Sequence, residues 1–170
     1  MKVAVIMGTS KSDGNTRHLV DAFVKKTDSK VFDLAKCNIS FFDYLHENKS
    51  DDFLPLIREL ISYDHIVFAT PVYWYSMSAQ LKVFFDRLSD LLTIEKDLGR
   101  DLKGKSISIL STGFDLSCPE CFIQPFEMTA NYMGLNFKGF EYVSVQSEIN
   151  SGALIKAAER AVACVTLQEN

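Results

Sequence analysis

Short, continuous apolar runs alternate along the chain with longer segments in which apolar residues recur at helical spacing. The runs predict buried strands at residues 2–7, 30–34, 65–70, 105–111 and 137–145. The longer segments predict helices at residues 15–27, 51–61, 78–92, 120–133 and 151–167. This alternation indicates an α/β fold, a parallel sheet covered by helices on both faces. Right-handed crossovers leave two common architectures, a flavodoxin-like fold and half of a Rossmann fold.

Composition narrows the possible classes of protein. The chain has 170 residues, 47% apolar and 24% charged, which fits one domain over residues 1–170. A net charge of −4 argues against a nucleic-acid partner, which would call for clustered basic residues. No run approaches the roughly 20 apolar residues of a membrane span, and the start does not resemble a signal peptide. We therefore expect a cytoplasmic protein with no membrane partner, whose four cysteines are thiols.

A polar loop, GTSKSDGNT, follows the first predicted strand at residues 8–16. It carries several short hydroxyl and amide side chains, and Gly14 precedes the predicted helix. Free N–H groups at a helix N-terminus bind phosphate well. The loop has neither the dinucleotide fingerprint nor a Walker A lysine, which favours a monophosphate. The alternative is a polar turn with an Asn or Thr helix cap.

Three consecutive aromatic residues, Tyr73 to Tyr75, follow the third predicted strand within TPVYWYSMS. Aromatic side chains on a loop need a partner, which here is a flat ring ligand or a neighbouring subunit. In the next helix, Asp86 and Arg87 are interpreted as ion-pair or cap partners. Lys82 is interpreted as a surface or phosphate-side contact.

Together, GTSKSDGNT and TPVYWYSMSAQLKVFFDR resemble the NAD(P)H-dependent FMN reductase family of the flavodoxin-like fold. That family carries a G-S-x-x-x-x-G-N-T phosphate loop and a P-x-Y…L-K-x-F-x-D-R segment. This chain has Thr9 and then Ser10 where the family shows Gly-Ser. The loop is also longer than that of electron-carrier flavodoxins, which favours the reductases. The resemblance implies a three-layer sandwich whose five-stranded parallel sheet has the order 2-1-3-4-5.

The resemblance also implies FMN as cofactor and NAD(P)H as co-substrate. The FMN phosphate would lie against residues 9–16, the ring along residues 71–74, and its pyrimidine side at the loop 111–115. Gly113 would let the backbone approach the flavin closely. No side chain is expected to be catalytic, because the chemistry would reside on flavin N5. The implied cofactor-binding residues are Thr9, Ser10, Ser12, Gly14, Asn15, Thr16, Pro71, Val72, Tyr73, Trp74, Ser111, Thr112, Gly113 and Phe114.

Cys118 and Cys121 form a C-x-x-C just before a predicted helix. Such a pair permits a disulfide, an activated thiol or half a metal site. Cys37 and Cys164 are isolated, so a complete metal site is not expected. Iron–sulfur members of the family carry a cysteine-rich insert where this chain keeps only Cys37. Three histidines without metal-binding spacing are expected to be structural: His18, His46 and His65.

The combined features predict an FMN-dependent oxidoreductase that takes hydride from NAD(P)H and passes electrons to a small-molecule acceptor. Quinones, flavins, azo or nitro compounds and metal chelates are candidate acceptors, with ping-pong kinetics. One alternative is a non-enzymatic flavodoxin-type electron carrier that docks protein partners. A second is an FMN-free scaffold on the same fold. The resemblance implies a homodimer, and a tetramer is also compatible with it.

Overall fold

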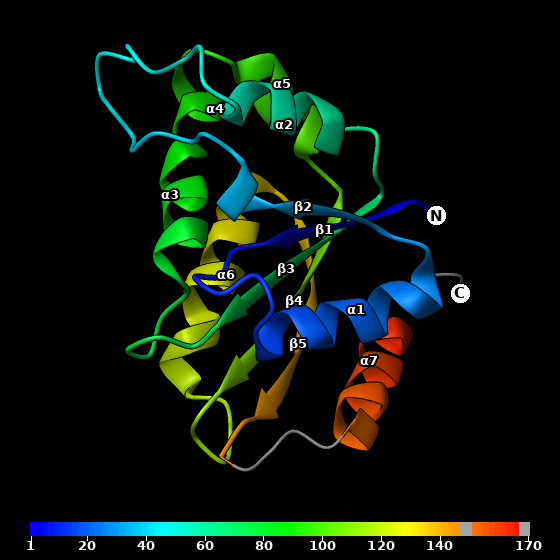
Figure 1. Cartoon of the computed structure of the whole chain (residues 1–170). Helices are drawn as coiled ribbons and strands as arrows, with labels where there is room; N and C mark the ends of the chain where they lie inside the picture. The colour runs from blue at the N-terminus through cyan, green and yellow to red at the C-terminus, as the bar shows by residue number, and fades with distance from the viewer. Residues whose placement is uncertain (147–150, 167–170) are drawn as a thin grey trace.

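In the computed structural model, which describes residues 1–146 and 151–166, five parallel strands form one sheet in the order β2-β1-β3-β4-β5 (Figure 1). This confirms the predicted flavodoxin-like order. The chain leaves β1 for one edge of the sheet and then crosses to β3 on the other side of β1. The strands are β1 (Val3–Met7), β2 (Lys30–Asp33), β3 (His65–Pro71), β4 (Ser106–Gly113) and β5 (Asn136–Ser144).

Helices cover both faces of the sheet (Figure 1). On one face lie α1 (Asn15–Thr27) and α7 (Ser151–Thr166). The other face is covered by α2 (Phe53–Leu60), α3 (Ala79–Arg87), α4 (Asp90–Thr93), α5 (Lys96–Leu102) and α6 (Glu120–Met133). The predicted end of the last helix, Leu167, lies outside the described residues.

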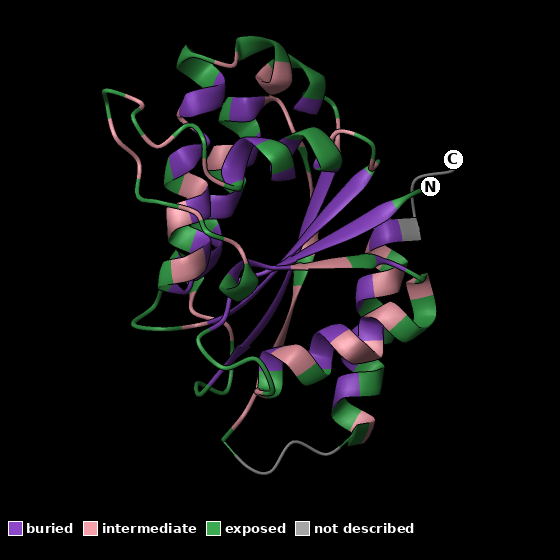
Figure 2. Cartoon of the chain, turned by 45° about the horizontal axis from the view of Figure 1, so that its top comes forward, coloured by how far each residue is buried: buried purple, intermediate pink, exposed green. Residues whose placement is uncertain are grey.

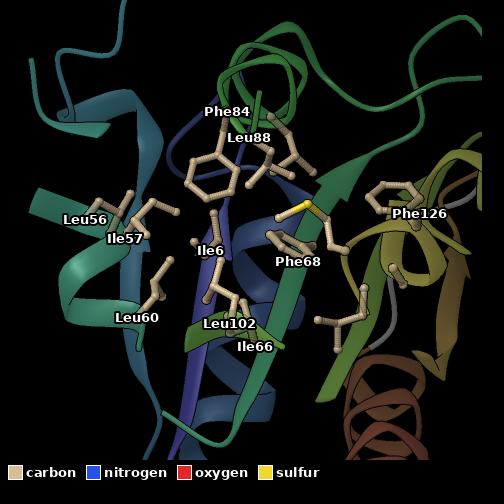
Figure 3. Packing of buried hydrophobic residues seen from close by; sticks show 14 of the residues in the cluster. Ile6, Leu56, Ile57, Leu60, Ile66, Phe68, Phe84, Leu88, Leu102 and Phe126 are labelled. Carbon is tan, nitrogen blue, oxygen red and sulfur yellow. The ribbon is translucent and has the colours of Figure 1, made fainter. Parts of the chain in front are cut away.

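Burial explains why the strands read as continuous apolar runs. In β1, Val5 and Met7 pack toward α1 and α7, whereas Ala4 and Ile6 pack toward the opposite helices. Figure 2 shows the central strands buried along their length. In Figure 3, Ile6 and Phe68 lie beneath Phe84 of α3, so this helix is seated directly on the sheet.

The predicted helix over residues 78–92 is wrong in extent, because the chain divides it into α3 and α4. The N–H groups of Leu88 and Ser89 donate to carbonyls three residues back, at 3.1 and 3.2 Å, which tightens the turn. The helical spacing of apolar residues continues from α3 into α4. The break between the two helices could therefore not be predicted from this spacing alone. The short α5 was also missed, because Leu102 is its one buried residue.

The predicted helix over residues 51–61 is also wrong at its start, which included Asp51 and Asp52. The helix α2 begins later, at Phe53. Asp51 accepts the N–H groups of Ser40 and Phe53 at 2.8 and 3.0 Å, and Asp52 accepts that of Asn38 at 2.7 Å. Both carboxylates therefore hold the preceding segment, residues 37–52, against the start of α2.

Arg87, at the end of α3, is fully buried and confirms the prediction of an ion-pair role. Its guanidinium pairs with Asp51 and, through Nε at 2.8 Å, with Asp90, and it lies 4.8 Å from the centre of the Phe53 ring. His46 Nδ1 lies 3.0 Å from the other oxygen of Asp90. This Arg87 cluster joins segment 37–52 to α3 and α4. Asp86 instead pairs with Lys82 on the surface.

None of the helices in the described part of the chain has the length and apolar character that a bilayer crossing requires.

His65 should make stability fall between pH 6.5 and 4. Its imidazole is fully buried on β3, with Nε2 2.8 Å from Ser108 Oγ, and burial, assisted by Lys138, lowers its pKa from 6.5 to about 4. Below pH 6.5 the unfolded chain binds a proton that the folded chain excludes. This difference costs about 3 kcal/mol of unfolding free energy once pH reaches 4.

Urea unfolding of His65→Gln across this pH range should show a shallower loss of stability than the parent chain. His18→Gln, which removes an exposed histidine, is the matched control and should keep the full slope. Parallel pH profiles for the parent and His65→Gln would contradict a neutral buried imidazole.

Candidate functional site

Buried hydroxyl groups join the carboxyl ends of β1 and β3 to the start of α3. Ser78 Oγ donates to the carbonyl of Gly8 at 2.8 Å and accepts the N–H of Leu81 at 3.3 Å, which caps α3. The N–H of Ser78 donates to Thr70 Oγ1 at 3.0 Å. One serine therefore fixes where the loops after β1 and β3 leave the sheet. Sequence analysis missed it, although a serine before a helix is a recognisable capping signal.

The start of α1 faces this same edge and is not capped by a side chain. Gly14 is the N-cap residue and, lacking a side chain, supplies no capping oxygen. The alternative of an Asn or Thr cap is therefore wrong. Thr16 is buried, and its hydroxyl lies 2.7 Å from that of Thr112 at the end of β4. Uncapped N–H groups and two adjacent hydroxyls give the polar end of the site.

A cleft of about 460 Å³ opens along this edge, within the range of small-molecule sites. Its lining combines the loop after β1 with the ends of β3 and β4. The lining residues are Thr9, Lys11, Asp13, Gly14, Asn15, Thr16, His18, Pro71, Val72, Tyr73, Thr112, Gly113, Phe114 and Val145. The structure thus brings together most of the residues that the sequence assigned to one site.

Four predicted residues lie outside the lining. Ser10 accepts a hydrogen bond from Gln80 Nε2 at 3.3 Å, and Ser12 is exposed. Trp74 is at the tip of a turn and is 94% exposed. Ser111 was expected to border the flavin ring, but it is buried within β4. Successive strand residues point to opposite faces, so Ser111 points away from the face on which Thr112 meets Thr16.

Four lining residues were not predicted. Lys11 and Asp13 belong to the loop after β1 and lie 3.9 Å apart, and both are exposed. Val145 follows β5, and its N–H donates to the carbonyl of Gly113 at 2.8 Å. His18 was expected to be structural, yet it is exposed at the cleft. Its position one turn into α1 is the signal that could have placed it there.

The aromatic residues form a tight hairpin, residues 73–76, which we call the aromatic hairpin. Tyr73 and Ser76 exchange backbone hydrogen bonds of 2.9 and 3.0 Å. Trp74 and Tyr75 both have positive φ, 48° and 63°. Bulky side chains rarely adopt this conformation, which costs of order 1 kcal/mol or more per residue. Tyr73 faces the cleft and is 44% exposed.

Gly113 has no room for a side chain within the protein itself. A Cβ atom there would lie 2.7 Å from Tyr142 Oη and 3.1 Å from Val72 Cβ. The space beside Gly113 is therefore filled by the protein itself, and the glycine permits packing between β4, β5 and the segment after β3. Tyr142 Oη donates to the carbonyl of Asp115 at 2.7 Å, so this packing also orders the loop after β4.

The chain was compared with protein families and with known proteins. Residues 1–121 match the family described as NADPH-dependent FMN reductase. The chain belongs to this family. A Bacillus subtilis (strain 168) protein named NAD(P)H-dependent FMN-containing oxidoreductase YwqN is 32% identical over 152 residues, covering 82% of this chain and 83% of its own. The predicted family is therefore confirmed.

Solved structures with a similar fold are also found. The Trp repressor binding protein from Bacillus subtilis has a TM-score of 0.73 and 26% identity, covering 99% of both chains. General stress protein 14 from Treponema denticola, solved in complex with FMN, has a TM-score of 0.70 and 20% identity. It covers 99% of this chain and 100% of its own, and it supports the fold.

Gly113→Ala should destabilise the chain by about 1–3 kcal/mol, the usual cost of overpacking. The new methyl group would displace Tyr142 and weaken its hydrogen bond to Asp115. In a Tyr142→Ala background the same substitution should cost less, because the clashing ring is absent. Urea unfolding of the four proteins in this double-mutant cycle measures the difference. Equal costs in both backgrounds would contradict the proposed packing role.

Proposed function

We propose that the chain holds FMN in the cleft, oxidises NAD(P)H and reduces a small acceptor. The observation that carries this proposal is that one cleft has a polar end suited to an anion and an apolar end suited to a ring. The uncapped start of α1 and the hydroxyls of Thr16 and Thr112 form an anion-binding end. Pro71, Val72 and Tyr73 form a flat, largely apolar end at the carboxyl edge of β3.

The polar end suits a phosphate monoester. Backbone N–H groups at the start of α1 carry the positive end of the helix dipole and would donate to phosphate oxygens. Asn15 is exposed toward the cleft, and Thr9 is buried beside it. The hydroxyl pair Thr16–Thr112 keeps one O–H free after the two groups bond to each other, since each hydroxyl has one donor. That hydrogen is available to a phosphate oxygen.

The apolar end suits a planar ring. Tyr73 and Phe114 both line the cleft and are 44% and 71% exposed, one after β3 and the other after β4. FMN, when bound, supplies hydride and electron transfer. The protein side chains bind and orient the ring and limit the thickness of what can lie against it. A slot bounded by aromatic rings favours planar acceptors, such as quinones, flavins and azo or nitro compounds.

The same proposal extends to the assembly and location of the chain. We propose one functional domain over residues 1–170 and a homodimer, with a tetramer as the alternative. Exposed apolar side chains on segment 37–52 and on α6 support a subunit contact: Phe41, Tyr44, Leu45, Met128 and Tyr132. Four free thiols fit a reducing, cytoplasmic setting.

The function is tested by an absorbance spectrum of the purified protein followed by anaerobic addition of NADPH or NADH. The proposal expects flavin bands that bleach within seconds and recover when a quinone is added. Bands that persist with either nucleotide but bleach with dithionite would favour an electron carrier. A colourless protein that does not bind added FMN would contradict both functions.

The double variant Asn15→Ala, Thr16→Ala should bind FMN at least about tenfold more weakly, because hydrogen bonds to a charged group contribute about 1.5–3 kcal/mol. Quenching of flavin fluorescence by the FMN-free protein measures the affinity. Thr27→Ala, at the opposite end of α1, is the matched control and should bind FMN normally. Unchanged affinity in the double variant would contradict the phosphate assignment.

A further inference from the structure

Cys118 and Cys121, the C-x-x-C pair, lie near the aromatic hairpin. Cys118 is half-buried against the same core cluster as Val72, the residue that precedes the hairpin. Cys121 is exposed in the first turn of α6, and its Sγ lies 3.9 Å from the carbonyl oxygen of Tyr75. That separation allows a weak S–H···O hydrogen bond. Cys121 therefore contacts the aromatic hairpin, and Cys118 packs on the same core cluster as the residue before it, although neither cysteine lines the cleft.

The two thiols differ in the way that thiol–disulfide exchange requires. Cys121 is accessible to a small disulfide, whereas Cys118 is shielded. Burial, reinforced by the neighbouring Cys121, raises the pKa of Cys118 to about 11, so this thiol stays protonated and unreactive toward solutes. An exposed attacking thiol and a shielded resolving thiol, three residues apart across a helix start, can close an intramolecular disulfide.

We propose that Cys118 and Cys121 form a second redox site, a dithiol that exchanges with small-molecule disulfides and alters the aromatic hairpin. First, the Cys121 thiol loses its proton to water, and its sulfur attacks the disulfide R–S–S–R, forms a mixed disulfide and releases one R–S⁻. This thiolate takes the proton of Cys118. The Cys118 sulfur then attacks that of Cys121 and releases the second R–S⁻, which takes a proton from water. The two cysteines lose two electrons and two protons, and R–S–S–R becomes two R–SH.

Closure of the disulfide removes the S–H donor of Cys121. The carbonyl of Tyr75 then loses its sulfur contact in a turn whose backbone is already strained at Trp74 and Tyr75. A strained turn persists only while its surroundings hold it. Oxidation should therefore change the aromatic hairpin and, through Tyr73, the width of the cleft. This dithiol site does not depend on the proposed flavin chemistry.

The exchange step is tested on the full-length chain equilibrated with oxidised glutathione, with intact mass and peptide mapping as readouts. The parent chain should lose two hydrogens and retain no glutathione on Cys121. Cys118→Ser should retain one glutathione on Cys121, because nothing resolves the mixed disulfide. Cys121→Ser should retain none on Cys118. Cys164→Ser, which removes another half-buried thiol, is the matched control and should behave like the parent.

Coupling to the aromatic hairpin is tested through Trp74, the sole tryptophan of the chain. Its fluorescence in FMN-free protein should shift on oxidation of the parent chain and of Cys164→Ser. It should also shift for Cys118→Ala, whose glutathione adduct on Cys121 removes the same S–H donor, and it should not shift for Cys121→Ser, which can form neither disulfide. The midpoint of the shift in glutathione buffers should match the midpoint for loss of free thiols.

Other outcomes overturn the proposal. A stable glutathione adduct on the parent Cys121 would show that Cys118 does not resolve it. A disulfide that forms without any change in Trp74 fluorescence would remove the link to the hairpin. Both results are independent of FMN binding and NAD(P)H oxidation, so failure of the dithiol site is distinguishable from failure of the proposed function.

Discussion

The hydrogen bonds of Ser78 are the constraint on which the site depends. Parallel strands bring the ends of β1, β3 and β4 to one edge, but they leave the direction of the following loops open. Ser78 removes that freedom, because it bonds to Gly8 after β1, to Thr70 within β3 and to the first turn of α3. All of these groups are buried, so breaking one bond would leave an unpaired polar atom in the interior.

The opposite end of α3 is fixed by the Arg87 cluster. Arg87 is fully buried, pairs with Asp51 and Asp90, and lies 4.8 Å from the centre of the Phe53 ring. Loss of one partner from a buried pair leaves an uncompensated charge, which typically costs about 3–5 kcal/mol. The helix is thus held at its start by Ser78, at its end by Arg87 and along its length by Phe84 on the sheet. Because α3 is held at these three places, the aromatic hairpin before it can keep two residues with positive φ.

Sequence patterns predicted the features that depend on local chemistry. Buried parallel strands must be apolar on both faces, so the strand runs and their order with helices were visible. The loop after β1 and the residues after β3 were recognisable from glycine, hydroxyl and aromatic spacing, and the structure brings them together.

Features that depend on residues distant in the sequence could not be predicted from local patterns. The strand β4 continues beyond its predicted end at Ser111, because β3 pairs with Thr112 and β5 pairs with Thr112 and Gly113. The helix α3 ends at Arg87, whose guanidinium pairs with Asp90 three residues further on. The role of Gly113 depends on Tyr142, a side chain on another strand.

Topology also explains why the C-x-x-C pair lies near the cleft. Each helix that follows a parallel strand begins at the carboxyl edge of the sheet, so α1, α3 and α6 all start there. Cys118 and Cys121 flank the start of α6, and this alone places them beside loops that are more than 40 residues away in sequence. The aromatic hairpin then has two neighbours: the cleft, which Tyr73 lines, and the thiols, one of which contacts Tyr75. A short hairpin with a strained backbone cannot adjust one side independently of the other. Residues 73–76 are therefore the route by which the proposed chemistry at the sulfur atoms would reach the cleft.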